Sequence, residues 1–268
     1  MTPVDVVRGD GPIVLGLPHT GTYVPEKISD SLTARGAELA DTDWHIHRLY
    51  DGLLAGATTV RATFHRYVID ANRAPSNESL YPGQNTTGLV PLTDFDGVDL
   101  WEERPSDDDV QCRLSTFHAP YHAALKAELE RVRRRHGIAV LYDCHSIRSE
   151  IPYLFEGVLP DFNIGTNLGT TCAVDFERAA EEVCTAADGY SCVMNGRFKG
   201  GWTTRHYGQP DVGVHAIQME LAQSTYLKAE SAPWTYSNAK SERVRSHLAA
   251  VLASLNSVAV LLSQQLKG

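Results

Sequence analysis

The fold is decided by the stretch Gly137-Ile-Ala-Val-Leu-Tyr-Asp-Cys-His145. Its apolar run Ile138–Tyr142 predicts a central buried strand, with polar side chains at the strand's carboxyl end. A helix is predicted before it, over Pro120–His136, because Gly137 is placed to cap a helix C-terminus. The arginines in the last turn of this helix suit a solvated end that complements the helix dipole, a reading we favour over a nucleic-acid patch.

The same alternation of strand and helix extends along the rest of the chain. Strands are predicted at Ile13–Leu17, Ala57–Ala62, Tyr67–Ala71, Ser191–Met194 and Val212–Leu221, and helices at Thr42–Leu54, Ala173–Ala187 and Val244–Leu262. Residues 75–100 are rich in Pro, Gly, Asn and Asp and predict a long loop, a kind of segment that often carries function. The alternation predicts an α/β sandwich with a mixed, mostly parallel central sheet, formed by residues 1–268 as a single domain.

The composition is compatible with one sizeable core and disfavours several classes of protein. The chain has 268 residues, of which 43% are hydrophobic and 21% charged. No apolar run approaches the length needed to span a bilayer, and the N-terminus lacks the features of a signal peptide. The net charge of -9 argues against general binding to nucleic acid or to an anionic membrane surface, although a small anionic substrate is compatible with it.

The cysteines indicate a reducing compartment. There are five of them, and they form no CxxC pair: Cys112, Cys144, Cys172, Cys184 and Cys192. An odd, scattered set indicates reduced thiols rather than a disulfide framework. Together with the lack of a targeting segment, this predicts a cytoplasmic location.

Two histidines fall where an α/β sheet gathers its ligands, at the carboxyl ends of strands. His19 follows the strand Ile13–Leu17, and His145 follows the central strand. Taken singly, either could be a hydrogen-bonding histidine at a strand end. Neutral imidazole is also the commonest zinc ligand, and catalytic sites use three protein ligands and one water. We therefore expect His19 and His145 to hold one divalent ion, Zn²⁺.

The third ligand is a choice between neighbouring carboxylates in the stretch Asp41-Thr-Asp-Trp-His45. Asp is a good helix N-cap, and only one of the two can cap a given helix. We assign Asp43 to the metal and leave Asp41 as the cap or as a partner of a ligand. Asp143 could orient a ligand imidazole by accepting its other N–H.

Glu220 lies near the end of the predicted strand Val212–Leu221. Side chains alternate along a strand, so Glu220 shares a face with Ala216 and Gln218. A carboxylate among apolar neighbours would suit a general base beside a metal-activated water. The alternative is an ion-paired residue at a strand end.

Several polar residues could recognise carboxylate groups, a task for which the planar guanidinium of arginine is well suited. They are Asn72, Arg73, Arg148, Arg197 and Arg205. Ordinary salt bridging is the alternative for each arginine. Gly200-Gly201 resembles a weak phosphate loop, but no Gly-Lys-Ser/Thr follows it, which disfavours an NTPase.

Several segments together resemble the N-formylglutamate amidohydrolase (N-formylglutamate deformylase) family of histidine degradation. They are Pro18–Gly21, Asp41–His45, Arg66–Asp70 with Asn72-Arg73, Leu80–Leu89, Pro120–Ala124, Asp143–Arg148, Leu154–Gly157, Asn195–Gly201 and Gln218–Tyr226. These segments cover nearly the whole chain in one order, which is more specific than any single motif.

The resemblance implies a three-layer fold like that of zinc carboxypeptidases and aspartoacylases. In that wider group the order is metal His, acidic ligand, Asn-Arg, metal His and catalytic Glu, here His19, Asp43, Asn72-Arg73, His145 and Glu220. The group usually has its acidic ligand three residues after the first His, where this chain has Thr22. Glu26 is another nearby acid, so the third ligand stays open among Asp43, Asp41 and Glu26.

The resemblance also implies an activity, the zinc-dependent hydrolysis of N-formyl-L-glutamate to L-glutamate and formate, with Glu220 as the base. It implies that Asn72-Arg73 bind one carboxylate of a small dianionic N-acyl amino acid. Arg148, Arg197 or Arg205 would bind the second carboxylate, and one of these cations could stabilise an oxyanion. Two alternatives are a deacylase for another N-acyl acidic amino acid, such as formylaspartate, and a non-catalytic relative that binds metal or carboxylate.

Overall fold

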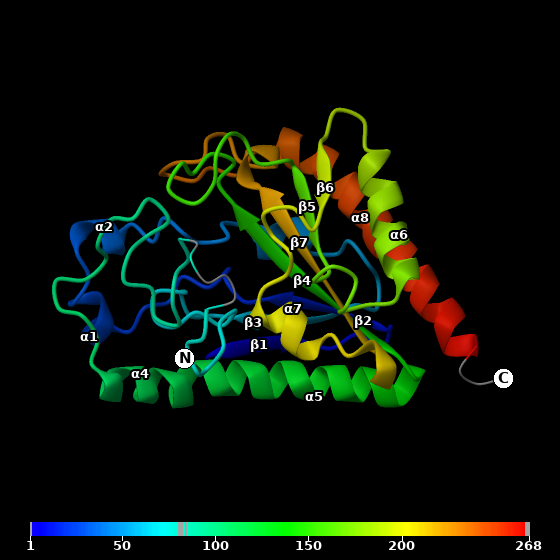
Figure 1. Cartoon of the computed structure of the whole chain (residues 1–268), viewed down its shortest axis with the longest axis horizontal. Helices are drawn as coiled ribbons and strands as arrows, with labels where there is room; N and C mark the ends of the chain where they lie inside the picture. The colour runs from blue at the N-terminus through cyan, green and yellow to red at the C-terminus, as the bar shows by residue number, and fades with distance from the viewer. Residues whose placement is uncertain (1, 80–82, 84, 266–268) are drawn as a thin grey trace.

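A central sheet organises the computed structural model, which describes residues 2–79, 83 and 85–265 (Figure 1). Within these residues the sheet has seven strands in the order β1-β3-β2-β4-β7-β5-β6. The strands are Val4–Val7 (β1), Ile13–Leu17 (β2), Thr58–Ala62 (β3), Ala139–Ile147 (β4), Phe162–Gly165 (β5), Cys192–Met194 (β6) and Val214–Ala222 (β7). Four of the neighbouring pairs are parallel, while β1 with β3 and β5 with β7 are antiparallel. The predicted mixed, mostly parallel sheet is confirmed.

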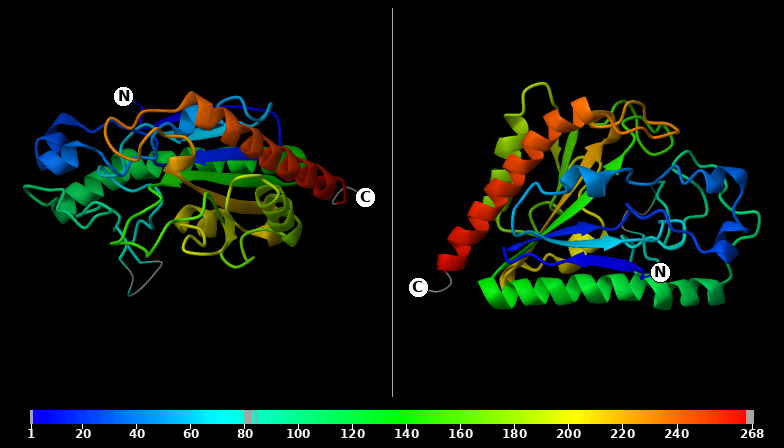
Figure 2. Two further views of the ribbon diagram at one scale, coloured as in Figure 1. Left: turned by 90° about the horizontal axis from the view of Figure 1, so that it is seen from above. Right: turned by 180° about the vertical axis from the view of Figure 1, so that it is seen from behind.

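Helices cover the two faces of this sheet, which makes three layers (Figures 1 and 2). The helices are Glu26–Ser29 (α1), Ala34–Ala37 (α2), Ile46–Tyr50 (α3), Asp107–Arg113 (α4), Ala119–His136 (α5), Val174–Thr185 (α6), Trp202–Tyr207 (α7) and Asn238–Gln265 (α8). Short turns of other helix types occur at Leu114–His118 (η1, a π-helix), Pro210–Val212 (η2) and Gln223–Thr225 (η3). Residues of α3, α6 and α8 share one core with β2, β4 and β7, and residues of α5 form a second core on the opposite face.

The central strand β4 shows how the sequence separates the two cores. Val140 and Tyr142 belong to the core of α6 and α8, whereas Leu141 belongs to the core of α5. Because side chains alternate, Asp143 and His145 point to the same face as Leu141. The strand is buried at all of its positions, which explains its nearly continuous apolar run.

Two predicted elements differ from the structure. The predicted strand Tyr67–Ala71 is wrong, because these residues form turns whose apolar side chains are buried without pairing in the sheet. The predicted helix Thr42–Leu54 is limited to α3, because His45 enters it in a left-handed conformation with φ 61°. In both places the pattern of apolar residues correctly indicates which side chains are buried, but it does not indicate the backbone conformation.

Other boundaries also moved. β4 continues past the predicted Ile138–Tyr142 to Ile147, since it pairs with β7 along its whole length, so His145 lies inside the strand. Strands β1 and β5 and helices α1, α2, α4 and α7 were not predicted, and α7 begins directly after the pair Gly200-Gly201. The long loop at 75–100 is confirmed for its described residues, although residues 80–82 and 84, part of the Leu80–Leu89 segment, lie outside them.

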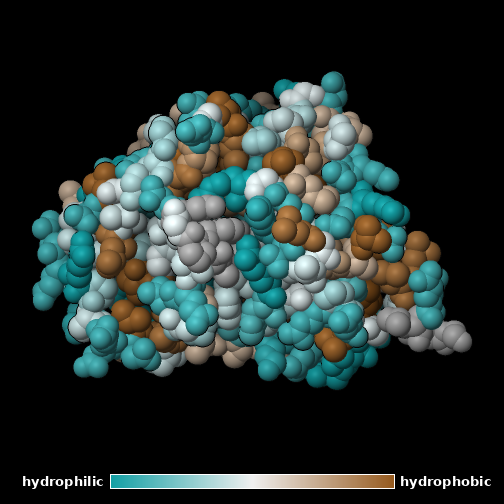
Figure 3. All heavy atoms as spheres, viewed as in Figure 1, coloured by the Kyte–Doolittle hydropathy of each residue, from teal (hydrophilic) through white to brown (hydrophobic). Residues whose placement is uncertain are grey.

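Helix α8 is long and apolar enough, by length and composition alone, to cross a membrane, so the expectation that no segment reaches that length was wrong. Its residues Val244, Leu248, Val251 and Leu255 are fully buried in the core shared with α6. The face of the molecule shown in Figure 3 is largely hydrophilic, with hydrophobic residues in small separate groups. The apolar character of α8 therefore serves, at least on its buried face, to close a core.

We predict that Leu248→Ala will lower the free energy of unfolding by about 2–5 kcal/mol, because it leaves a cavity in this core. The matched control is Leu261→Ala in the same helix, where the side chain is 59% exposed and the change should stay within about 0.5 kcal/mol. Urea unfolding followed by circular dichroism measures both. Equal losses in the two variants would contradict the assignment of the buried face.

Candidate metal centre and substrate pocket

Three buried side chains from separate segments meet at the carboxyl end of the parallel strands. His19 lies just after β2, Asp43 in the turn before α3, and His145 in β4. Asp43 Oδ2 lies 3.8 Å from His19 Nδ1 and 3.3 Å from His145 Nδ1. One potential ligand atom from each residue lies within 4.8 Å of the others. Among the described residues, this group has the composition and spacing of a metal site.

The opposite nitrogen of each imidazole faces a second carboxylate. His19 Nε2 lies 2.7 Å from Asp70 Oδ1, and His145 Nε2 lies 3.2 Å from Asp143 Oδ1. Ligand histidines in metal sites characteristically direct their outer nitrogen to a carboxylate in this way, which leaves the inner nitrogen for the ion. Asp143 was suggested for this role from the sequence, and it lies at ion-pair distance from His145 Nε2, where Asn72 Nδ2 also lies at 3.2 Å. Asp70 was not singled out, although its position after apolar Tyr67–Ile69 was a signal of a buried charge.

The chemistry of these residues fits a divalent cation. His19 Nδ1 is buried and has no hydrogen-bond partner among the described residues. Burial, assisted by the charge of Arg66, lowers the pKa of His19, so the ring is neutral, as a metal ligand must be. Burial also disfavours a charged His145, but Asp143 and Asp43 raise its pKa well above the usual value, so an ion that binds this ring must displace a proton from it. Two imidazole nitrogens and a carboxylate oxygen are a donor set that Zn²⁺ prefers.

The other two acids considered as ligands lie elsewhere. Asp41 Oδ2 accepts a hydrogen bond from the backbone N–H of Phe95 at 3.0 Å, and burial raises the pKa of Asp41 to about 7. Its suggested role as a helix cap is wrong, since His45 occupies the N-cap position of α3. Glu26 is exposed on α1, which Figure 1 shows well away from the carboxyl ends of β2 and β4. The geometry favours Asp43.

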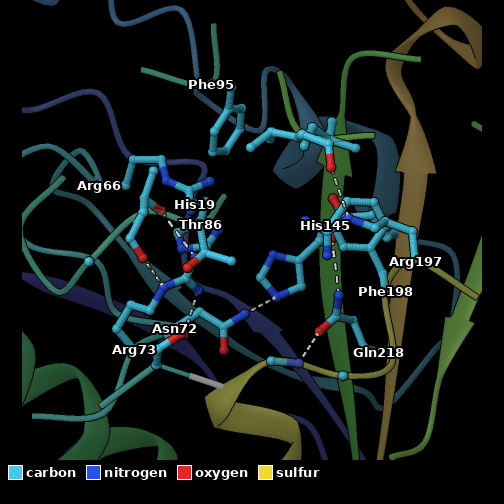
Figure 4. A pocket seen from close by; sticks show the side chains of 18 of the residues that line it. His19, Arg66, Asn72, Arg73, Thr86, Phe95, His145, Arg197, Phe198 and Gln218 are labelled. Atoms are coloured by element: carbon cyan, nitrogen blue, oxygen red, sulfur yellow. Dashed lines mark hydrogen bonds between the residues drawn. The ribbon is translucent and has the colours of Figure 1, made fainter. Parts of the chain in front are cut away.

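A cavity of about 280 Å³ opens beside this group (Figure 4). Part of its lining comes from the long loop, including Asn77, Thr86 and Thr87. Phe95 and Phe198 add apolar surface. The cavity thus combines the candidate metal-binding group with both polar and apolar walls, as small-molecule sites do.

Glu220 lines the same cavity from β7. In the pairing of β4 with β7 it is the direct partner of His145, which puts its carboxyl group beside the centre. Gln218 Nε2 donates a hydrogen bond to Glu220 Oε2 at 3.0 Å, and burial raises the pKa of Glu220 to about 8. The predicted alternation along this strand is confirmed, because Ile217 and Met219 face the opposite core.

Three of the five residues proposed to bind substrate line the cavity, namely Asn72, Arg73 and Arg197. Arg73 Nε donates to the carbonyl oxygen of Thr87 at 2.8 Å. Asn72 Oδ1 accepts from the backbone N–H of Thr203 at 2.9 Å, and Asn72 Nδ2 lies 3.2 Å from His145 Nε2, the contact drawn in Figure 4. Arg197 Nε donates to the carbonyl oxygen of Leu154 at 3.2 Å, so each of the three side chains is held by the surrounding backbone or by a neighbouring side chain.

The other two arginines are not part of the described lining. Arg148 lies directly after the end of β4, and its Nη2 donates to Asp96 Oδ1 at 2.8 Å. Arg205 lies on α7 and its Nε donates to the carbonyl oxygen of Gly200 at 2.8 Å. Arg66, which the sequence reasoning did not assign, does line the cavity. It is buried, pairs with Asp70 at 2.6 Å and stacks over Phe95.

Comparison with known proteins identifies relatives over most of the chain. Residues 11–227 match the family model described as N-formylglutamate amidohydrolase. An N-formylglutamate deformylase of Pseudomonas aeruginosa is 46% identical over 251 residues, which cover 92% of this chain and 94% of that protein. An N-formylglutamate deformylase of Pseudomonas putida is 47% identical over 232 residues, which cover 85% of this chain and 86% of the relative.

Solved structures share the fold. The crystal structure of an N-formylglutamate amidohydrolase from Ralstonia eutropha JMP134 matches with a TM-score of 0.79 and 23% identity, covering 99% of this chain and 100% of that one. A gene product of Agrobacterium tumefaciens matches with a TM-score of 0.74 and 18% identity, covering 96% of each chain. At these identities the two structures establish the α/β fold and nothing finer.

The choice of the acidic ligand is tested by the pair Asp43→Asn and Asp41→Asn. We predict that Asp43→Asn will lose most of its bound zinc, because a neutral amide is a poor zinc ligand. Asp41→Asn should keep about one ion per chain, since this carboxyl accepts a hydrogen bond from the backbone of Phe95 and is not one of the three grouped ligands. Elemental analysis after dialysis against trace zinc gives the stoichiometry. Zinc lost from the Asp41 variant and kept by the Asp43 variant would reverse the assignment.

Proposed function

The chain belongs to the N-formylglutamate amidohydrolase family, and from this premise we propose that it hydrolyses N-formyl-L-glutamate to L-glutamate and formate with the help of one zinc ion. The observation that carries the proposal is the meeting of His19, Asp43 and His145 at a cavity that also holds Glu220. Relatives of similar length, 46% and 47% identical, bear the name N-formylglutamate deformylase. The reaction would belong to histidine degradation.

The three ligands would present one atom each. His19 and His145 would bind the ion through Nδ1, with Asp70 and Asp143 fixing the orientation of their rings, and Asp43 would bind through Oδ2. When bound, such an ion supplies Lewis acidity, which polarises the formyl oxygen and lowers the pKa of water toward about 7.

Glu220 supplies the proton transfers. Its carboxylate accepts a proton from the attacking water as the new C–O bond forms at the formyl carbon. The C–N bond then breaks, and Glu220 delivers this proton to the leaving nitrogen, so that glutamate and formate are released. Its burial, which raises its pKa to about 8, makes both protonation states accessible near neutral pH. Gln218 fixes one carboxyl oxygen through its hydrogen bond.

The arginines that line the cavity suit a substrate with two carboxylates. Asn72-Arg73 would bind one carboxylate of the substrate and Arg197 the other, since these residues line the cavity. Arg66 is buried in the same lining as His19, and its positive charge can stabilise the oxyanion that develops at the formyl group. Arg148 and Arg205 are not among the lining residues, and we assign them no role in substrate binding.

We further propose that residues 1–268 form a single amidohydrolase domain. One sheet takes its strands from Val4 to Ala222, and α8 then packs against its core. The site residues are drawn from β2 to β7, from His19 to Glu220, so the site is not confined to one part of the chain.

Formate release by the zinc-loaded protein tests the function. We expect the highest kcat/KM on N-formylglutamate, a lower value on N-formylaspartate, and little turnover of N-acetylaspartate, whose acyl group is larger. Removal of zinc with a chelator should abolish the activity, and added zinc should restore it. No formate from any substrate would indicate a non-catalytic relative, while a preference for N-formylaspartate would assign another substrate.

The role of Glu220 is tested by Glu220→Gln. We predict a fall in kcat of about 10²- to 10⁴-fold, the usual contribution of a general acid–base group, with zinc content unchanged. The matched control is Glu26→Gln, where the same change is made on the exposed surface of α1. Full activity in the Glu220 variant would remove this residue from the base role.

A further inference from the structure

Two histidines behind the cavity contact the substrate-binding segment and are not used by the chemistry above. His122 Nε2 lies 2.8 Å from the carbonyl oxygen of Ala71, and His118 Nε2 lies 3.0 Å from the carbonyl oxygen of Arg73. A carbonyl oxygen only accepts, so both Nε2 atoms carry a proton and donate it. The two rings therefore bracket Asn72, one on each side along the backbone.

A local feature of the long helix accompanies this pair. The π-helical turn η1, Leu114–His118, joins α4 to α5, and the three form one continuous rod in Figure 1. Pro120, which follows within the first turn of α5, has no N–H and its ring crowds the carbonyl four residues earlier, so the regular α-helical bonding is interrupted there. His118 and His122 are four residues apart across this start of α5, and they lie on one face of the helix.

Both rings are neutral. Burial, together with the charge that His118 would carry, lowers the pKa of His122 to about 3, and burial also lowers the pKa of His118. The bond to the carbonyl oxygen of Ala71 places the proton of His122 on Nε2. The hydroxyl of Tyr207 on α7 lies 3.1 Å from His122 Nδ1 and donates to the backbone carbonyl oxygen of His122 at 3.2 Å. The histidines act as hydrogen-bond donors with a defined direction, and not as charges.

The segment needs such donors because its backbone belongs to no strand or helix. A buried carbonyl oxygen without a partner is costly, and here side chains supply the partners. From the cavity side, Asp70 accepts from the backbone N–H of Asn72 at 2.8 Å. The backbone N–H of Thr203 on α7 donates a hydrogen bond to Asn72 Oδ1. Gly201 leaves room for the Asn72 side chain, because a Cβ added to Gly201 would lie 2.3 Å from Asn72 Nδ2.

We propose that His118 and His122 are positioning residues, which hold the Asn72-Arg73 segment in the geometry that binds a substrate carboxylate. This inference rests on the proposed function. Since a displacement of about 1 Å in a substrate-positioning group can cost roughly 100-fold in rate, two directed hydrogen bonds to this backbone matter for binding as well as for stability.

The test replaces each ring by one of similar shape that cannot donate, His118→Phe and His122→Phe. We expect KM for N-formylglutamate to rise about tenfold or more in each variant, with a smaller change in kcat and normal zinc content. His118→Gln and His122→Gln should return KM to within about threefold of the original, because the glutamine Nε2 can donate from nearly the same place. The matched control is His206→Phe, since His206 stacks on Trp202 in the same aromatic cluster but is exposed and donates to neither carbonyl.

The outcomes separate this proposal from the proposed function. An unchanged KM in the phenylalanine variants of an active enzyme would overturn the positioning role and leave the function standing. If the original protein released no formate, crystal structures of the variants would decide: an Asn72-Arg73 segment that moves supports the positioning role, and one that stays in place overturns it. If a phenylalanine variant does not fold, His118→Asn or His122→Asn takes its place, because the shorter amide cannot reach the carbonyl oxygen that the histidine Nε2 contacts.

Discussion

The candidate centre depends on one buried interaction, the 2.7 Å contact between His19 Nε2 and Asp70 Oδ1. It turns the other nitrogen of His19 toward Asp43 and His145. Burial alone would raise the pKa of Asp70, but Arg66 and His19 hold it well below its usual range, so the carboxylate stays charged. An isolated buried charge would be unstable, and the partners of Asp70 are what allow it to lie there.

The same carboxylate links the metal ligands to the substrate-binding segment. Asp70 Oδ1 accepts from both His19 and the backbone N–H of Asn72, while Oδ2 accepts from Arg66. The orientation of a ligand ring and the placement of the Asn72-Arg73 backbone are thus set by one side chain. His145 and Glu220 are placed separately, as direct neighbours on β4 and β7, the rigid middle of the sheet.

Much of this arrangement follows from the sequence, for definite physical reasons. Short apolar runs located β2 and β4, and the rule that ligands gather at the carboxyl ends of parallel strands put His19, His145 and Glu220 together. The choice of Asp43 over Asp41 depends on a turn that ends in a left-handed His45, which no periodicity encodes. Arg66 and Asp70 escaped assignment because Tyr67–Ala71 looks like a strand, although it is a buried turn whose partners lie far away in the chain.

The most direct test of this account is a crystal structure of the zinc-loaded protein with anomalous scattering recorded at the zinc edge. The account predicts one ion at about 2.0–2.1 Å from Nδ1 of both His19 and His145, with an oxygen of Asp43 as the third protein ligand. Asp70 and Asp143 should remain at the Nε2 atoms. An ion bound through either Nε2, or held by Asp41 or Glu26, would contradict it.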